Sequence, residues 1–191
     1  MATFFTSDTH FGHKNIINYC DRPFDSVEEM DLALTENWND TVGPDDVVYH
    51  LGDLSFGTSG YTRQVFSRLN GCIRVLGLPW HHDKGWLPRR GAGLSTFLSK
   101  SGHPVEILLP VHVYRCKLRG KRRVITLSHY PMAQWEASHH GHWHIHGHSH
   151  GTHTAEGAVL DVGVDCCDYR PVALADLPDL IPDAVTTPQF G

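Results

Sequence analysis

Aspartate and histidine recur along this chain in short blocks, and these residue types bind divalent metal ions through oxygen and nitrogen atoms. The blocks are, in chain order, Asp8-Thr9-His10, Gly52-Asp53, Gly77-Leu78-Pro79-Trp80-His81-His82-Asp83, Leu127-Ser128-His129-Tyr130-Pro131 and Gly147-His148-Ser149-His150. Histidine is also unusually frequent, because its 16 copies equal the number of Lys and Arg residues together. Imidazole is the commonest metal ligand in proteins, so this excess is consistent with a metal-centred protein.

The blocks follow short apolar runs of the kind that form buried strands. The runs that precede the first four blocks are 3–7, 47–51, 73–76 and 124–127. In sheets covered by helices, ligands gather outside the carboxyl ends of the strands. We therefore expect the carboxylates and imidazoles to converge on one sheet edge and to form a metal site there.

Each block also has a plainer interpretation when it is taken alone. An Asp-x-His pattern is weak evidence for a metal site, and a Gly-Asp pair after a strand is usually a turn. A lone histidine such as His129 is more often a hydrogen-bonded core residue than a ligand. The occurrence of all the blocks in one order, after strand-like runs, is what favours the metal site.

The order D-x-H, G-D, Gly…His-Asp, H and G-H-x-H resembles that of the calcineurin-like metallophosphoesterase superfamily, most closely its small, cap-less bacterial and phage branch. The flanking segments 7–13, 162–165 and 169–171 resemble the family too, so the likeness spans roughly residues 3–175. One block departs from the pattern, since the family has G-N-H-D. Here no Asn lies between Gly77 and Asp83, and three extra residues intervene.

The resemblance implies an α/β (α+β) fold, a four-layer αββα sandwich of two mixed sheets flanked by helices, with the site at the strand carboxyl ends. It also implies two divalent metal ions bridged by Asp53, with Asp8, His10 and His150 around the first ion. His129 and His148 would belong to the second. Two ions about 3.5–4 Å apart suit in-line displacement at phosphorus. Mn²⁺ is favoured, and Fe, Zn²⁺ or Ni²⁺ are alternatives, because His/Asp sites accept all of them.

In the family the Asn of the altered block is a ligand of the second ion, the His is the general acid and the Asp orients that His. Counting back from Asp83 places His81 at the Asn position and His82 at the general acid, with the residues 78–80 as an insertion. The alternative is that the insertion turns both histidines away, so that water fills the ligand position. Within the insertion, Trp80 is expected to wedge the loop rather than stack on an aromatic leaving group.

Other histidines have less defined roles. His13, three residues past His10, either contacts a substrate phosphate or forms hydrogen bonds within its own loop. His139 and His140 are expected in an exposed loop. His144 and His146 alternate with one apolar residue, so they share a strand face and lie either behind the metal ligands or toward solvent.

Hydrophobic periodicity and the placement of Gly and Pro predict the secondary structure. Helices are expected at 15–20, from the capping-box pattern Ser26-Val27-Glu28-Glu29 to Gly43-Pro44, and at 61–69. The first half alternates strands and helices, with strands at 46–51 and 73–76, which predicts parallel pairing. The second half is rich in strands on short connections, at 105–109, 111–118, 122–127, 143–146 and 159–164.

The chain of 191 residues is long enough for a core of its own, and we expect a single domain over 1–191 with a loosely packed tail from about 178. A net charge of −5 disfavours sequence-independent electrostatic binding to nucleic acid. The basic segment 119–123 is expected to be a solvated hairpin turn. Five cysteines without a C-x-x-C pair, no signal peptide and no long apolar run predict a cytoplasmic protein without membrane association.

These observations favour a binuclear-metal hydrolase of small phosphate esters. A phosphodiesterase acting on diesters such as cyclic nucleotides is preferred, because a cap-less site is open and no arginine near the motifs would meet the extra charge of a monoester. A nuclease or a phosphomonoesterase of the same fold is an alternative. So is a degenerate, non-catalytic metal-binding protein, given the altered block. The oligomeric state does not follow from the sequence.

Overall fold

The computed structural model describes residues 1–78, 81–87, 92–153 and 157–181, so Pro79 and Trp80 of the insertion lie outside the described residues. In chain order the elements are β1 (Thr3–Thr6), α1 (Lys14–Tyr19), α2 (Val27–Thr41), β2 (Val47–His50), α3 (Ser59–Phe66), β3 (Cys72–Leu76), the 3-10 turn η1 (His82–Gly85), β4 (Gly93–Leu98), β5 (Pro104–Leu108), β6 (Val111–Leu118), β7 (Lys121–Ser128), η2 (Ser138–His140), β8 (Trp143–His146), β9 (Val159–Asp161), η3 (Val164–Cys166), β10 (Val172–Ala173) and α4 (Leu177–Leu180).

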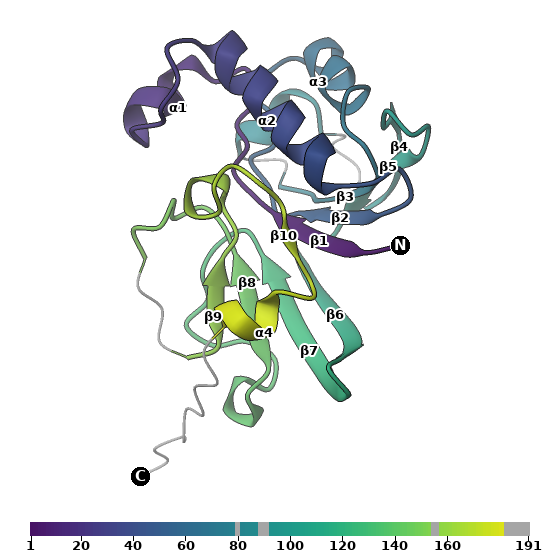
Figure 1. Cartoon of the computed structure of the whole chain (residues 1–191), viewed down its shortest axis with the longest axis vertical. Helices are drawn as coiled ribbons and strands as arrows, with labels where there is room; N and C mark the ends of the chain where they lie inside the picture. The colour runs from purple at the N-terminus through teal and green to yellow at the C-terminus, as the bar shows by residue number, and fades with distance from the viewer. Residues whose placement is uncertain (79–80, 88–91, 154–156, 182–191) are drawn as a thin grey trace.

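The strands form two mixed sheets. The six-stranded sheet has the order β10-β1-β2-β3-β5-β4, in which β1, β2, β3 and β5 are parallel and the two edge strands are antiparallel. The four-stranded sheet has the order β6-β7-β8-β9, with β7, β8 and β9 parallel. Figure 1 shows α1, α2 and α3 on one side of β1 to β3 and the four-stranded sheet on the other. The predicted α/β sandwich with two mixed sheets is confirmed.

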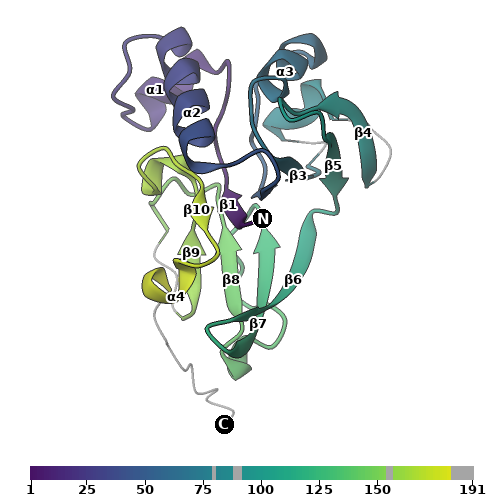
Figure 2. The same ribbon diagram turned by 45° about the vertical axis from the view of Figure 1, so that its right-hand side comes forward.

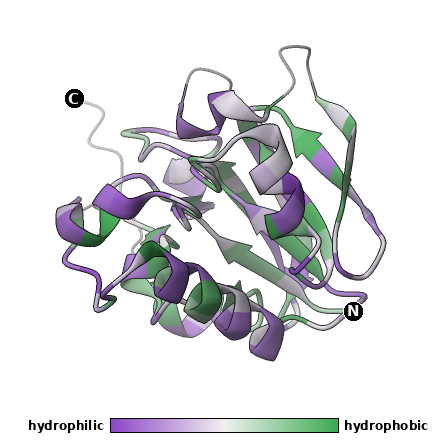
Figure 3. Cartoon of the chain, turned by 90° about the horizontal axis from the view of Figure 1, so that it is seen from above, coloured by the Kyte–Doolittle hydropathy of each residue, from purple (hydrophilic) through white to green (hydrophobic). Residues whose placement is uncertain are grey.

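Alternation along the strands produces two cores. Phe4, Val48 and Ile73 face the helices and pack with buried residues of α2 and α3. The neighbouring residues Phe5 and Tyr49 point the other way and pack against the inner face of the four-stranded sheet. Seen from above, the helices carry both hydrophilic and hydrophobic residues, as expected where only one helix face is buried (Figure 3).

Helix α2 begins and ends where its sequence predicts. The Ser26 side chain accepts a hydrogen bond from the backbone N–H of Glu29, as in a capping box, while the Glu29 carboxylate accepts from the N–H of Asp25. The helix ends at Thr41, before Gly43-Pro44. The buried face of this helix packs on β1 and β2, the strands that lead into the site.

The outer face of the four-stranded sheet is covered mainly by the segment between β7 and β8. His144 and His146, on β8, are both buried, so the alternative in which they face solvent is excluded. The backbone N–H of Met132 donates to Nε2 of His144, whose Nδ1 lies 3.0 Å from the carbonyl oxygen of Thr126. The Trp135 ring packs on the same imidazole. One ring nitrogen of His144 thus holds this loop, and the other bonds to strand β7.

Some elements were not expected from the sequence. Strands β4 and β10 extend the six-stranded sheet at its edges, and α4 lies within the predicted tail. Leu177 and Ile181 are buried, because they pack into the core between the sheets, so the loosely packed tail does not begin at 178. Residues 182–191 of that tail lie outside the described residues.

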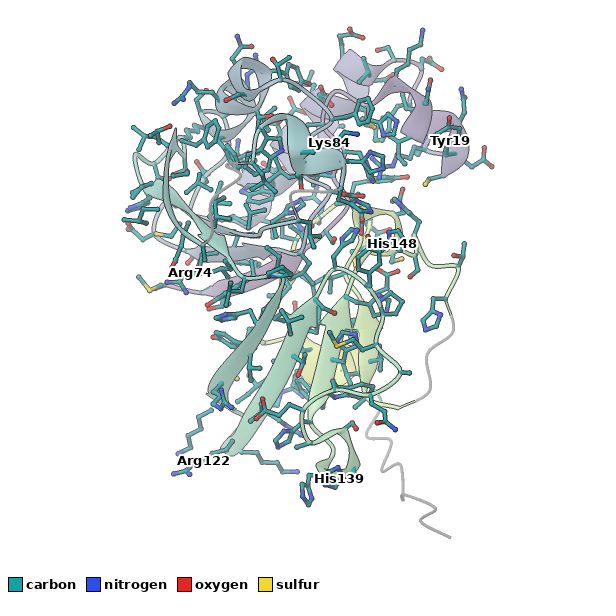
Figure 4. All side chains as sticks on the ribbon, turned by 180° about the vertical axis from the view of Figure 1, so that it is seen from behind. Tyr19, Arg74, Lys84, Arg122, His139 and His148 are labelled. Carbon is teal, nitrogen blue, oxygen red and sulfur yellow. The ribbon has the colours of Figure 1, made fainter. Side chains whose placement is uncertain are left out.

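The basic segment forms the expected hairpin between β6 and β7, with Leu118 paired to Lys121. Arg119 and Gly120 both have positive φ, as a two-residue hairpin turn requires. Figure 4 places Arg122 and His139 at one end of the molecule, far below His148. Within the described ranges, no helix has the length and apolar character needed to cross a bilayer.

Candidate metal centre

The parallel strands of both sheets end at one place, and the loops that follow them are joined there by backbone hydrogen bonds. The N–H of Asp8 donates to the carbonyl oxygen of Gly52 (3.1 Å), and the N–H of His10 donates to that of Asp53 (3.0 Å). In the four-stranded sheet the N–H of Gly147 donates to the carbonyl oxygen of His129. Figure 2 shows β1 running toward the same junction as β8 and β9. The predicted convergence of the blocks is therefore present in the fold.

The backbone at this junction is unusual. Of the ten non-glycine residues with positive φ in the described part of the chain, five belong to the motif blocks: Asp8, His10, Asp53, His148 and His150. Asp and His adopt this conformation more readily than most residues, and left-handed backbone concentrates at functional sites. Because the strand geometry ends at Asp8, the side chains of Asp8 and His10 can turn to the same side.

Gly147 is required by close packing. A Cβ atom built on it would lie 2.3 Å from Oδ2 of Asp8 and 2.2 Å from Oγ of Ser7. Gly52 is restricted in the same way, since it has a φ of +119° and its Cβ would lie 2.9 Å from Nδ1 of His129. These two glycines let the chain approach the clustered ligands rather than displace them.

The first ligand group consists of Asp8, His10 and His150, whose potential ligand atoms lie within 4.8 Å of one another. Oδ2 of Asp8 accepts the backbone N–H of His148 (2.8 Å), whereas Oδ1 has no hydrogen-bond partner among the described residues. Nε2 of His10 is buried and likewise unpartnered within the described chain. These three residues are the ones that the resemblance assigns to the first ion.

The second ligand group consists of Asp53, His81, His129 and His148, again with ligand atoms within 4.8 Å of one another. Oδ1 of Asp53 pairs with Nδ1 of His81, and Oδ2 lies 3.6 Å from Nε2 of His129. The altered block therefore brings His81 to the place that the count from Asp83 predicts. The alternative in which the insertion turns this histidine away is not what the structure shows.

Asp53 also faces the first group. Its Oδ2 atom lies 3.6 Å from Nε2 of His10, the same distance as to Nε2 of His129. One buried carboxylate thus stands between two sets of nitrogen and oxygen ligands. A carboxylate in this position can contribute an oxygen to both sides.

Burial dominates the electrostatics of the cluster. It raises the pKa of Asp8 to about 7 and lowers the pKa of His129 to about 3, because it penalises the charged form of each group. Burial also opposes ionisation of Asp53, but the hydrogen bond with His81 counteracts it and helps to keep the pKa of Asp53 below its usual value. Neutral imidazoles next to an ionised carboxylate are the forms that bind metal ions.

The donor set fits divalent cations of borderline hardness. Buried polar atoms without hydrogen-bond partners are costly, and here Oδ1 of Asp8 and Nε2 of His10 and His129 are in that state among the described residues. All three belong to the two ligand groups. A bound cation would satisfy each of them, which is the physical argument for a metal at both groups.

His82 and His13 lie beside the first group. Nε2 of His82 is 3.9 Å from Oδ2 of Asp53, and its ring centroid is 5.1 Å from that of His10. Its ligand atom also falls within 4.8 Å of those of His10 and Asp53, so His82 is within reach of the cluster. Nδ1 of His13 lies 3.3 Å from Nδ1 of His10, on the side away from Asp53. The structure thus places both residues next to the ligands.

Asp83 does not have the role that the resemblance implies for it. Its Oδ1 atom accepts three hydrogen bonds, from the backbone N–H groups of Leu54 and Ser55 and from Nε1 of Trp86, and no hydrogen bond to His82 is present. Burial raises the pKa of this carboxyl to about 6. Asp83 therefore joins η1 to the loop after Asp53 and is not a side-chain hydrogen-bond partner of His82.

Comparison with known proteins gives a family but no activity. No model of a known protein family matches the chain. It is 33% identical over 177 residues to the uncharacterized protein MJ1445 of Methanocaldococcus jannaschii, which covers 88% of this chain and 84% of the relative. This chain belongs to the MJ1445 family.

Two phage proteins and one solved structure are also similar. The gene 66 protein of Mycobacterium phage L5 is 28% identical over 207 residues, covering 94% of this chain and 93% of the phage protein. The gene 66 protein of phage D29 is 29% identical over 168 residues, covering 76% and 77%. The crystal structure of AQ665 from Aquifex aeolicus, a protein of unknown function, has a TM-score of 0.63 at 24% identity, covers 94% of this chain and 99% of that one, and therefore shares the fold.

In this member of the MJ1445 family, sequence reasoning missed a buried ion pair behind the first ligand group. The guanidinium of Arg22 donates to both carboxylate oxygens of Asp165 (2.7 and 2.8 Å) and to the carbonyl oxygens of Asp8 and Thr9. Oδ2 of Asp165 lies 2.6 Å from Nδ1 of His150. The expectation that no arginine lies near the motifs is wrong. Asp165 stood in a segment that resembles the family, but nothing in the sequence connected it with Arg22.

This ion pair orients His150. Burial lowers the pKa of His150, but the hydrogen bond with Asp165 and the negative charges of Asp8 and Asp165 together outweigh it, and the net shift is upward. A histidine whose Nδ1–H is held by a carboxylate presents Nε2 as its free ligand atom. Arg22 in turn holds Asp165 and the two carbonyl groups of the first motif, so it fixes both the ligand and the loop that carries Asp8.

Proposed function

We propose that this protein is a hydrolase of phosphate esters that works with two divalent metal ions, Mn²⁺ being favoured. The observation that carries the proposal is the position of Asp53 between two ligand groups, with one carboxylate oxygen 3.6 Å from a histidine nitrogen of each. Asp8, His10 and His150 would hold the first ion, and His81, His129 and His148 the second. When bound, such a pair of ions activates water and neutralises phosphoryl charge.

The protein's own groups supply the remaining parts of this chemistry. His82 would hold a proton at Nε2 and give it to the leaving oxygen, because that atom lies at the edge of the cluster and its imidazole is only half-buried. Burial lowers the pKa of His82, which makes its protonated form a stronger acid. His13, beside His10, is positioned to contact a phosphoryl oxygen.

Small diesters, cyclic nucleotides among them, remain the preferred substrates. Arg22 is near the motifs, but its side chain is fully buried and its donors are engaged by Asp165 and two carbonyl groups, so it is not available to the extra charge of a monoester. The net charge of −5 disfavours nucleic acid as a substrate. A cytoplasmic setting is part of the proposal, since the five cysteines form no disulfide.

The rival function is a non-catalytic metal-binding protein. The departure from the family's third block motivates it, because an unfilled ligand position would weaken the second ion. The contact between His81 and Asp53 favours the hydrolase instead, since an imidazole takes the place of the amide ligand.

The decisive experiment uses protein stripped of metal and then supplied with Mn²⁺. We expect hydrolysis of bis(p-nitrophenyl) phosphate to appear with Mn²⁺ and to exceed that of p-nitrophenyl phosphate at matched metal and pH. Binding of two ions per chain without hydrolysis of any ester would favour the non-catalytic alternative. Faster turnover of the monoester would overturn the diester preference alone.

A further inference from the structure

Aromatic side chains form an exposed surface beside the candidate metal centre. His13, Tyr19 and Phe56 make up this aromatic shelf. The rings of His13 and Phe56 are stacked, with centroids 4.4 Å apart and an angle of 14° between their planes. The Tyr19 ring meets His13 edge-on at 6.2 Å. Phe56 and Tyr19 keep 51% and 73% of their surface exposed, whereas His13, which contacts both, is only 8% exposed. The shelf therefore meets solvent through Phe56 and Tyr19.

The shelf is held in place by the same backbone that carries the ligands. The N–H of Phe56 donates to the carbonyl oxygen of Phe11 (3.0 Å), one residue past His10. The N–H of Ser55, the preceding residue, donates to Asp83 in η1. Phe56 is therefore tied both to the loop of the first ligand group and to the turn that contains His82.

The shelf adjoins the side of the centre where the leaving group would depart. The Phe56 ring lies 5.4 Å from that of His82, and His13 lies at the same distance from it. In Figure 4, Tyr19 and Lys84, two residues past His82, both lie above His148. Scattered exposed apolar residues are ordinary on protein surfaces, but contiguous rings beside a polar cluster indicate a binding surface.

We propose that the aromatic shelf binds a planar aromatic group on the leaving side of the substrate, either an aryl ring next to phosphorus or a nucleobase one sugar away. This inference rests on the proposed function and narrows its substrate class. Phe56 stacks on His13 and is still 51% exposed, so its ring offers surface for a further planar group. Stacking on an aromatic ring strengthens binding of planar groups by about tenfold, or about 1.4 kcal/mol. This gain from stacking does not depend on which base or ring is bound.

The test measures equilibrium binding to the Mn²⁺-loaded protein by calorimetry. Methylphosphonate and phenylphosphonate, which resist hydrolysis, differ only in the ring. Ribose 5-phosphate and adenosine 5′-monophosphate, checked as intact by ³¹P NMR, form the second pair and distinguish a distant base from an adjacent ring. We expect about tenfold tighter binding of the aromatic member in at least one pair.

Phe56→Ala should abolish this preference and leave methylphosphonate and ribose 5-phosphate binding unchanged, whereas Phe56→Trp should keep it. Leu98→Ala is the matched control, because Leu98 is 52% exposed on β4, an edge strand, and should alter nothing. A wild-type protein without aromatic preference, or a preference that survives Phe56→Ala, would overturn the shelf while leaving the hydrolase intact. Failure of all four probes to bind the Mn²⁺-loaded protein would also overturn the shelf, whereas the hydrolase is judged separately by hydrolysis of bis(p-nitrophenyl) phosphate.

The shelf could instead be buried between two copies of the chain, and sedimentation velocity tests this directly. A monomeric wild-type protein is expected. If the wild type is a dimer that Phe56→Ala converts into monomers, the shelf is an interface between copies and the proposal is wrong.

Discussion

The two ligand groups are built from similar residues but are supported in different ways. Behind the first group, the buried Arg22–Asp165 ion pair fixes His150 and the carbonyl groups of the loop that carries Asp8. The second group has no comparable charge network among the described residues. Its histidines pack ring against ring, with centroids of His81, His129 and His148 4.7–5.5 Å apart and Tyr130 4.5 Å from His148.

This difference shows how one protein can hold two ions with unequal rigidity. Charge-assisted hydrogen bonds orient a ligand directionally, whereas ring packing leaves more freedom to rotate. We therefore expect the first ion to bind more tightly than the second. The predictions that follow remove the shared carboxylate Asp53, the proposed acid His82, the second-group ligand His81 and finally the Asp165 support of the first group.

The largest effect is expected for Asp53→Asn, because this carboxylate faces both groups. Loss of its charge should reduce the affinity for both ions by more than about 100-fold and abolish ester hydrolysis. Metal content per chain after dialysis against Mn²⁺ measures this, with Asp45→Asn, an exposed aspartate away from the site, as the control. Retention of one tightly bound ion would show that Asp53 is not shared.

The next effect is on rate rather than on metal binding. His82→Ala should keep both ions but lower the rate by about 10²–10⁴-fold, with the greatest loss on esters of poor leaving groups. A series of phosphodiesters with leaving groups of rising pKa measures the dependence. If His82→Ala instead releases an ion from the first group, His82 is a ligand there, as its nearness to His10 and Asp53 would permit.

Much of this centre follows from the sequence, for a simple physical reason. The ligands Asp8, Asp53 and His129 come directly after apolar strands, and parallel strands bring their carboxyl ends to one edge. The place of each ligand just after a strand therefore predicts where that ligand lies in the fold. His81 could be placed by counting back from Asp83 along the motif, because that count does not depend on the conformation of the insertion.

The support of the first group could not be derived in this way. Arg22 and Asp165 are separated by 143 positions, and their pairing exists only once both sheets and the loop after β9 have assembled. An arginine in a loop gives no local periodicity that points to a buried partner. Asp83 illustrates the opposite error, since its place in a motif suggested a bond to His82 whereas the folded chain uses it to hold Leu54 and Ser55.

A smaller and more selective effect is expected for His81→Ala. Removal of this imidazole should lower the affinity for the second ion by about 100-fold, while the first ion stays bound, because His81 contacts Asp53 and belongs only to the second ligand group. Titration with Mn²⁺ followed by electron paramagnetic resonance resolves the two steps. His139→Ala, at an exposed histidine far from the centre, is the control. Equal weakening of both ions would contradict the division into two groups.

The smallest effect is expected from the support behind the first group, and it tests the comparison directly. Asp165→Asn keeps the shape and can still accept a hydrogen bond from Arg22, but it weakens the grip on Nδ1 of His150. We expect the affinity for the first ion to fall by about 10–100-fold, as is typical when a group that orients a ligand is lost. The second ion should be unaffected.

The control is Asp161→Asn, at the end of β9, where the carboxylate accepts a hydrogen bond from Ser149 next to His150. It separates the loss of the His150 contact from a general loosening of this loop. Asp165→Asn leaves the buried charge of Arg22 without its carboxylate partner, which lowers the stability of the fold. Thermal unfolding without metal therefore checks that the variant is folded. If Asp165→Asn leaves the order of ion binding unchanged, the difference between the two groups has a source other than this ion pair.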